Sequence, residues 1–169
     1  MKKIFLDVFI IAVIVATAMF VYQTYGTQII EFFFGEQPAT MFVESTPISV
    51  TVADEYEEGV QGLSGVESLR EFEGKLFVFP EEDLHGIWMK DMLMPLDIIW
   101  INNEFKIVHI EENVSPDTYP DSFEPEEPAR FVLEVNAFFA RNANVEVGDV
   151  VTVPASALPL DLIEILQDF

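Results

Sequence analysis

The sequence predicts an α+β fold that is mainly β, in one compact domain behind an apolar N-terminal segment. Half of the 169 residues are hydrophobic, which is enough for a folded core despite a formal net charge of −22. Six or seven short stretches rich in β-branched and aromatic residues are separated by Gly, Pro or Asn. This pattern is typical of a barrel-like or sandwich-like domain with one or two short helices.

Composition excludes several classes of protein. The chain has 30 acidic and 8 basic residues, so we expect no nucleic-acid partner, because phosphate binding needs a basic face. The absence of cysteine excludes disulfides, thiol catalysis and cysteine-ligated metals. The sequence also lacks the motifs of P-loop proteins, dinucleotide-binding folds, α/β-hydrolases and zinc proteases. We therefore expect no cofactor.

The N-terminal segment 1–22 has the features of a membrane anchor. Lys2 and Lys3 precede an apolar run over residues 4–22, which as a helix would span roughly 28 Å, close to the hydrocarbon thickness of a bilayer. The two lysines predict a single-pass protein of the cell membrane, with a cytoplasmic N-terminus and an extracytoplasmic domain. Alternatively, Ala16-Thr17-Ala18 is a signal-peptide cleavage site, and cleavage near Ala18 would yield a periplasmic or secreted protein.

The remaining chain is divided into three parts by composition. Residues 23–44 are interpreted as a juxtamembrane connector, because Gly35 and Pro38 would break a continuing helix. Residues 45–154 form the predicted domain, which is long enough to bury a single core. Residues 155–169 are a C-terminal extension, with a helix expected over 160–167.

The first part of the domain is expected to hold one strand and one short helix. Residues 48–53 alternate between apolar and polar positions as a strand does. A helix over 55–61 is expected to follow, because Asp54 can cap its start and Gly62 can end it. Another helical turn is expected over 66–71.

The middle of the domain is expected to be built of short strands, over residues 75–79, 87–90, 97–102 and 104–111. The third of these is apolar on both faces, which predicts a central strand. Asn102-Asn103 is a plausible hairpin turn because asparagine tolerates a positive φ.

The last part of the domain begins with an acidic loop over 115–128, where four prolines disfavour a strand ladder. Residues 129–136 alternate again and predict a strand, followed by a short helix over 137–142. A closing strand is expected over 148–153.

Four segments carry a resemblance to a known family. They are Gln61-Gly62-Leu63-Ser64-Gly65, GKLFVF (74–79), IWMKDMLMPLDIIWI (87–101), and ARFVLEVNA (129–137) with Gly148-Asp149. With these segments, residues 48–153 resemble the small prokaryotic proteins called domain of unknown function 192. The resemblance covers roughly two-thirds of the chain. It implies a compact β-rich fold, often behind a signal or membrane segment, and no established reaction.

Six side chains within these segments are interpreted as a ligand site, namely Trp88, Lys90, Asp97, Arg130, Glu134 and Asn136. Basic residues are scarce in so acidic a domain, so Lys90 and Arg130 are candidate anion contacts and Trp88 a candidate aromatic platform. Asp97 and Glu134 are the candidate acid–base groups. The alternative is a set of internal ion pairs, Lys90–Asp97 and Arg130–Glu134.

The sequence offers two candidate metal sites, but no metal is expected at either. His85 with Met89, Met92 and Met94 offers ligands suited to copper(I), but methionine is a common core residue. His109 with Glu111 and the acids of 117–127 lacks the regular spacing of a calcium loop.

We therefore expect a binding or accessory module, anchored in the membrane, for a small polar, anionic or sugar-like ligand. One alternative is a small hydrolase of envelope material that uses Asp97 and Glu134 as its carboxylates. The other is a structural domain whose acidic surface meets a partner protein. The lack of a catalytic motif favours a binding protein over an enzyme.

Overall fold

The computed structural model describes residues 13, 15–17, 19–24, 38–54, 56–153, 155–158 and 163. The chain divides into two units, Met1–Gln37 and Pro38–Phe169. In the first unit, the described residues from 13 to 24 are helical. Among the described residues, no helix is both long and apolar enough to cross a membrane. The greater part of the predicted segment 4–22, and nearly all of the predicted helix over 160–167, lie outside the described residues.

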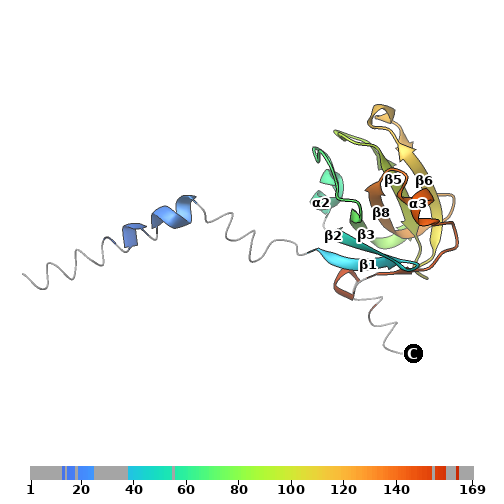
Figure 1. Cartoon of the computed structure of the whole chain (residues 1–169), viewed down its shortest axis with the longest axis horizontal. Helices are drawn as coiled ribbons and strands as arrows, with labels where there is room; N and C mark the ends of the chain where they lie inside the picture. Colours follow the sequence, from blue (N-terminus) through green and yellow to red (C-terminus); the bar gives the residue numbers. More distant parts are fainter. Residues whose placement is uncertain are drawn as a thin grey trace, which may run out of the picture. The chain divides into compact units, whose positions relative to one another are not determined.

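The second unit is mainly β, which confirms the predicted fold class (Figure 1). Its described strands are β1 (Ala39–Val43), β2 (Thr46–Ala53), β3 (Glu73–Asp83), β4 (Ile87–Trp88), β5 (Leu96–Ile101), β6 (Ile107–Val114), β7 (Ser122–Phe123), β8 (Ala129–Asn136) and β9 (Val151–Thr152). The short helices are α2 (Tyr56–Gln61), α3 (Phe139–Ala143), and the 3₁₀ turns η1 (Pro116–Thr118) and η2 (Ala155–Ala157).

Seven strands form one curled sheet in the order β6-β5-β8-β3-β2-β1-β9, while β4 and β7 pair separately (Figure 1). All neighbours are antiparallel except β2 and β3, whose parallel pairing requires the crossover that contains α2. The two edges of the sheet meet at one corner. There Lys106 bridges to Val150, and the Ile107 N–H donates to the Asp149 carbonyl over 2.9 Å.

Both faces of the central strands are buried, because each face carries its own core. One core lies inside the curl and receives side chains from all seven strands, among them Met41, Leu76 and Phe131. The other lies on the outer face of the sheet and includes Phe77 and Trp100. All six residues of β5 are buried, which confirms the predicted central strand.

Several element boundaries differ from the sequence-based expectation. β1 lies inside the predicted connector 23–44 and pairs with β2, so the folded domain starts earlier than residue 45. β3 continues past Pro80, although proline has no backbone N–H to donate. The pairing of β3 with β8 is interrupted between Val78 and Asp83, so no hydrogen bond between the strands is lost there. The predicted helical turn over 66–71 is wrong, because residues 66–70 are irregular.

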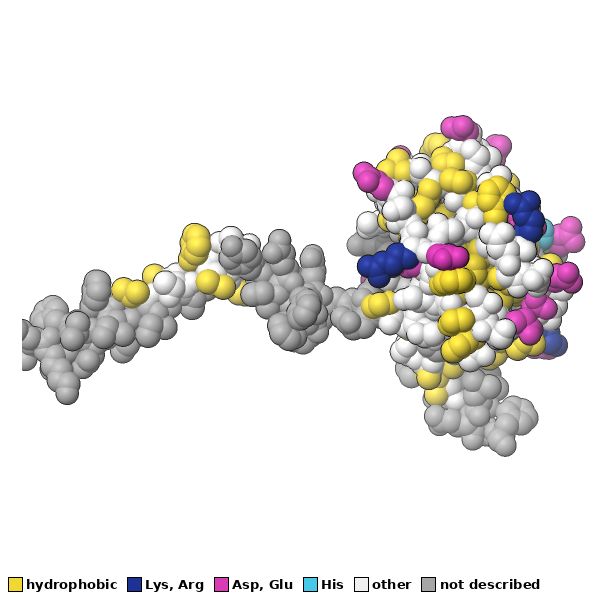
Figure 2. All heavy atoms as spheres, in the orientation of Figure 1, with side chains coloured by type: hydrophobic (Ala, Val, Ile, Leu, Met, Phe, Trp, Pro, Cys, Tyr) yellow, Lys and Arg dark blue, Asp and Glu magenta, His cyan; other side chains and the backbone are white. Residues whose placement is uncertain are grey.

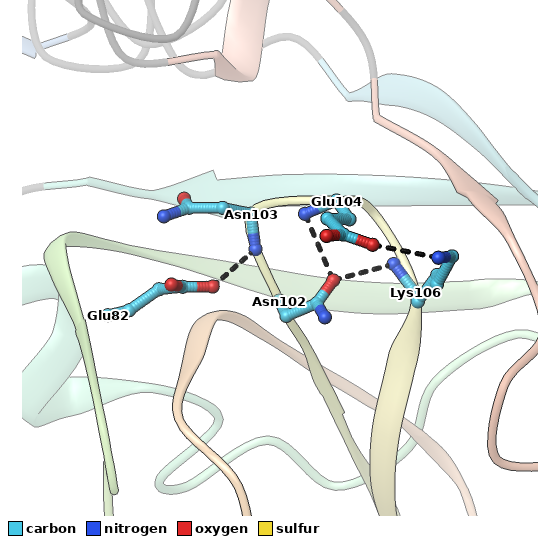
Figure 3. Close-up of polar contacts among 5 residues, drawn as sticks. All are labelled: Glu82, Asn102, Asn103, Glu104 and Lys106. Carbon is cyan, nitrogen blue, oxygen red and sulfur yellow. Dashed lines mark hydrogen bonds and ion pairs between the residues drawn. The ribbon is translucent and has the colours of Figure 1, made fainter.

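The turn between β5 and β6 is longer than the predicted Asn102-Asn103 hairpin (Figure 3). The Asn102 side-chain oxygen accepts hydrogen bonds from the N–H groups of Glu104 and Lys106, each at 3.0 Å. Phe105, and not an asparagine, takes the left-handed conformation, with φ of 58°. The return strand therefore begins at Ile107, three residues later than expected.

The acidic loop over 115–128 is also more ordered than expected, because it holds η1 and β7. Ser115 caps η1, accepting from the Asp117 N–H, and β7 pairs with β4. In Figure 2 acidic side chains lie on several parts of the face in view, with only a few lysines and arginines among them.

Candidate functional site

A cavity of about 350 Å³ lies between the outer face of the sheet and the segments that cover it. Its floor comes from β3 and β8, and its walls come from the end of β2, from α2 with the turn after it, and from β4. Most of the lining is apolar, including Leu63, Phe77, Ile87 and Met92. Among the described residues that line it, none is a lysine, arginine or histidine. The cavity is therefore suited to an uncharged, mainly apolar molecule.

The cover of this cavity is fixed by hydrogen bonds between two segments far apart in the sequence. The Ser64 hydroxyl donates to the Lys90 carbonyl over 2.8 Å, and the Gly65 N–H donates to the Asp91 carbonyl over 2.9 Å. Gly62 and Gly65 adopt positive φ values of 51° and 78°, which glycine takes without strain. The conformation of this turn therefore explains why residues 61–65 contain two glycines.

Glu134 is the buried polar side chain of the cavity. Only 5% of this residue is exposed, and its Oε2 atom has no hydrogen-bond partner among the described residues. Burial raises the pKa of the Glu134 carboxyl from 4.5 to about 8, against an opposing effect of the Lys75 charge. Near neutral pH, this carboxyl is therefore mainly protonated and can donate a hydrogen bond.

The sheet register explains why Glu134 reaches this place. β8 lies between β3 and β5, and Glu134 is directly opposite Lys75 on one side and Ile98 on the other. Successive side chains alternate between faces, so Glu134 points to the outer face while Leu133 and Val135 pack inside the curl. Gly74 allows β3 to approach, because a Cβ there would lie 2.6 Å from the Glu134 carbonyl oxygen.

Trp88 lies at the rim of the cavity and is 47% exposed. Its ring makes an edge contact with Tyr119, with 5.9 Å between centroids. The Lys90 Nζ atom lies 5.8 Å from the centre of the Trp88 ring, but Lys90 does not line the cavity. Of the six predicted ligand residues, the structure brings Trp88 and Glu134 to the cavity.

Asp97 is placed elsewhere, and its role is structural. It is fully buried, its Oδ1 accepts from the Asn113 and Phe138 N–H groups, and its Oδ2 accepts from the Ala140 N–H, at 2.8–2.9 Å. It thereby caps α3, whose own N-cap residue makes no side-chain cap bond. Ile98 shares a face with Glu134, so its neighbour Asp97 points to the opposite face. Asp97 and Glu134 therefore cannot flank one bond.

Arg130 and Asn136 also make structural contacts outside the cavity. The Arg130 Nε donates to the Phe79 carbonyl over 2.8 Å. The Asn136 side-chain amide donates to the Arg70 carbonyl over 2.6 Å, and Asn136 lines a second, more open cavity of about 570 Å³. The alternative ion pairs, Lys90–Asp97 and Arg130–Glu134, do not occur among the ion pairs of the described residues.

The methionines and histidines of the two metal hypotheses have other environments. Met89, Met92 and Met94 are buried in the outer-face core. The His85 ring stacks on Phe79 with 3.7 Å between centroids, and its Nε2 atom lies 2.9 Å from the Glu81 carbonyl oxygen. Within the described part of the chain, no group of three or more His, Asp or Glu side chains could hold a metal ion.

Gly59 is a cavity residue that sequence reasoning did not single out. It lies inside α2, where glycine costs roughly 0.5–1 kcal/mol relative to alanine. A Cβ atom at Gly59 would meet nothing within 4 Å, so neither packing nor a positive φ requires glycine here. Gly59 thus lines the cavity with backbone atoms alone, and there is room for a side chain at this position. The signal that could have revealed it is a glycine in the interior of a predicted helix.

Two solved structures resemble this chain. One is a Sinorhizobium meliloti protein described as a candidate transcription regulator, with 27% sequence identity and a TM-score of 0.64, covering 72% of this chain and 98% of its own. The other is a protein of unknown function from Novosphingobium aromaticivorans, with 26% identity and a TM-score of 0.67, covering 71% of this chain and 88% of its own. A search of curated proteins finds no match.

A family model also matches the chain, over residues 39–153. This match begins at β1 and ends just after β9, so it spans the folded domain that the structure shows. Its description is that of an uncharacterised conserved group, "Uncharacterized ACR". The chain therefore belongs to the family called domain of unknown function 192, as its four sequence segments predict.

Proposed function

We propose that the domain is a binding module for a small, mainly apolar molecule, held in the cavity beneath α2 and β4. The observation that carries this proposal is an apolar cavity of about 350 Å³ with one buried carboxyl that has an unpartnered oxygen. Pockets for small ligands measure roughly 300–1,000 Å³ and combine apolar walls with a few polar groups. A buried polar atom without a partner is costly, and a bound ligand would supply that partner.

The position of the basic residues changes the ligand class that we propose. An anionic or sugar-like ligand was expected because of Lys90 and Arg130, but neither lines the cavity. The apolar lining instead supports a ligand with an apolar body and one polar group. A hydrolase that uses Asp97 with Glu134 receives no support, because the two carboxyls lie on opposite faces of the sheet. A net charge of −22 argues against DNA as a partner.

Blocking the cavity tests this proposal. Gly59→Leu adds a side chain to the cavity wall, and we expect it to weaken binding of the apolar probe indane by at least roughly tenfold. Trp88 at the rim provides the signal, because the other tryptophan, Trp100, is fully buried. Val147→Leu, at an exposed position outside the cavity, is the matched control and should leave binding unchanged. Equal binding by both variants would contradict the proposed site.

We also propose that residues 4–22 anchor the domain at the outer side of the cell membrane. The support is the apolar run of bilayer-spanning length after Lys2 and Lys3. We expect the full chain to stay in the membrane pellet during an alkaline carbonate wash and to be released by detergent. Release by carbonate, or a mature N-terminus at Met19, would instead establish the cleaved form.

A structural domain that binds a partner protein through its acidic surface is the other function that the sequence allows. The cavity gives a way to separate the two. A protein-interaction role predicts that Gly59→Leu leaves binding of the partner protein unchanged, whereas a binding module requires the open wall at Gly59.

A further inference from the structure

We infer that the ligand is a neutral molecule whose apolar body fills the cavity and whose hydrogen-bond acceptor, such as a carbonyl oxygen, meets the Glu134 carboxyl group. This inference rests on the proposed binding function and adds the chemical class of the ligand. It assigns Glu134 a role in recognition, which is distinct from the acid–base role considered from the sequence.

The position of Glu134 suits its carboxyl group to bind a molecule inside the cavity. The residue is 5% exposed and lines the floor, and its Oε2 atom is buried with no partner among the described residues. Both oxygens of Asp97, the other buried carboxylate, accept hydrogen bonds, from three backbone N–H groups together. Glu58 Oε2 and Asn103 Oδ1 are also buried without a partner among the described residues, but of the three residues Glu134 is the one that lines the cavity. The open hydrogen-bonding capacity at Glu134 is therefore directed at something that enters the cavity.

The charge state of Glu134 selects a neutral partner. Because burial raises its pKa to about 8, the group near neutral pH is an O–H donor, and a carbonyl oxygen is its natural acceptor. A cationic ligand would need an ion pair in an apolar cavity, where desolvation of both charges is expensive. An anionic ligand would need a basic partner, and the described lining residues include none.

Other charged side chains lie on the elements that enclose the cavity, and one of them affects the pKa of Glu134. Lys75 faces it across the β3–β8 pair and opposes the effect of burial on its pKa. These elements and the residues that flank them also carry Arg130 on β8, Asp54 before α2, Glu57 and Glu58 within α2, Lys90 after β4, and Glu73, Glu81, Glu82 and Asp83 on β3. Substitution of Glu134 itself therefore identifies which group controls any pH dependence of binding.

The test uses four probes that share one bicyclic body, with the purified full chain and the emission of Trp88 as signal. The probes are indane, indanone, aminoindane and indane carboxylate. At about pH 7 we expect indanone to bind roughly tenfold more tightly than indane, and the two charged probes to bind more weakly than indanone. Indanone affinity should be constant below about pH 7, fall by about half near pH 8 and be several-fold lower at about pH 9, as Glu134 loses its proton.

Two variants separate recognition from structure. Glu134→Gln keeps an N–H donor without a titrating proton, so it should retain the preference for indanone and remove the loss of affinity at about pH 9. Glu134→Met keeps the approximate volume without a donor, so it should bind indane and indanone equally. Glu112→Gln, at an exposed position on β6, is the control and should behave as the unmodified protein.

The outcomes distinguish this inference from the proposed function. If indane and indanone bind equally to the unmodified protein, the assigned ligand class is wrong while the cavity remains a binding site. If aminoindane binds most tightly, and its affinity rises between about pH 6 and pH 8, the ligand is a cation and the inference is overturned. If no probe binds in a way that Gly59→Leu weakens, the proposed function fails together with the inference.

Discussion

Replacement of Asp97 by alanine is expected to destabilise the domain by about 3–5 kcal/mol. The Asp97 carboxylate is fully buried and accepts hydrogen bonds from the N–H groups of Asn113, Phe138 and Ala140. Alanine would leave these donors without an acceptor and would remove the cap of α3. Urea unfolding of the purified protein, followed by the emission of Trp100, measures the loss.

Two further variants show whether the effect of Asp97→Ala comes from the cap. Asp97→Asn keeps one acceptor oxygen but turns an amide donor toward a backbone N–H, so its loss should be smaller than that of alanine. Asp121→Ala, at an exposed position, should change the free energy of unfolding by less than about 0.5 kcal/mol. A loss for Asp97→Ala no larger than the loss for Asp121→Ala would contradict the structural role of Asp97.

Glu134→Gln is expected to stabilise the domain increasingly as the pH rises from about 4.5 to 8. Because the pKa of Glu134 is raised to about 8 in the folded protein, the native state keeps a proton that the unfolded chain releases above its ordinary pKa of 4.5. The stability from this protonated group is therefore fully present below pH 4.5 and is lost as the pH rises toward 8. The glutamine variant has no such loss.

The size of this effect follows from the two pKa values. At about 1.36 kcal/mol per pKa unit, their difference corresponds to roughly 5 kcal/mol between the pH limits. The free energy of unfolding of both proteins, measured in urea at several pH values, should show curves that diverge and then run parallel above pH 8. Repulsion within the acidic domain affects both proteins alike, so the difference isolates Glu134. Curves that stay parallel from pH 4.5 upward would show an ordinary pKa.

Much of the fold could be predicted from the sequence where the pattern is local. Residues 129–136 alternate between apolar and mainly polar positions, and they coincide with β8. The apolar run after Pro95 predicts a central strand, and β5 is buried throughout. The turn after β5 could not be predicted in detail, because its shape depends on the Asn102 side chain and on a phenylalanine in the left-handed region.

The candidate site could be predicted only in part, because composition does not show what a side chain meets in space. Trp88 and Glu134 were expected to share a site, and the structure brings both to one cavity. Asp97 was expected there too, but its partners Asn113, Phe138 and Ala140 lie far along the chain and bind it through their backbones, which leaves no sequence signal.

The residues that form the walls of the cavity could not be predicted from the sequence, for a related reason. Leu63, Phe77 and Ile87 are ordinary core residues in a sequence, and nothing in their identity indicates that they line a cavity. Gly59 leaves a space only because α2 lies over the outer face of the sheet. The site thus depends on how α2, the turn after it and β4 pack over the sheet, and this packing cannot be read from a single sequence.

The most direct test of the cavity as the functional site is a titration of isotope-labelled protein with indanone, followed by the backbone amide shifts in NMR spectra. The account predicts saturable shifts that cluster at Gly59, Gly62, Leu63 and Ile87, which line the cavity around Glu134. Shifts that do not saturate, or that cluster around Asn142 in the second cavity, would contradict it.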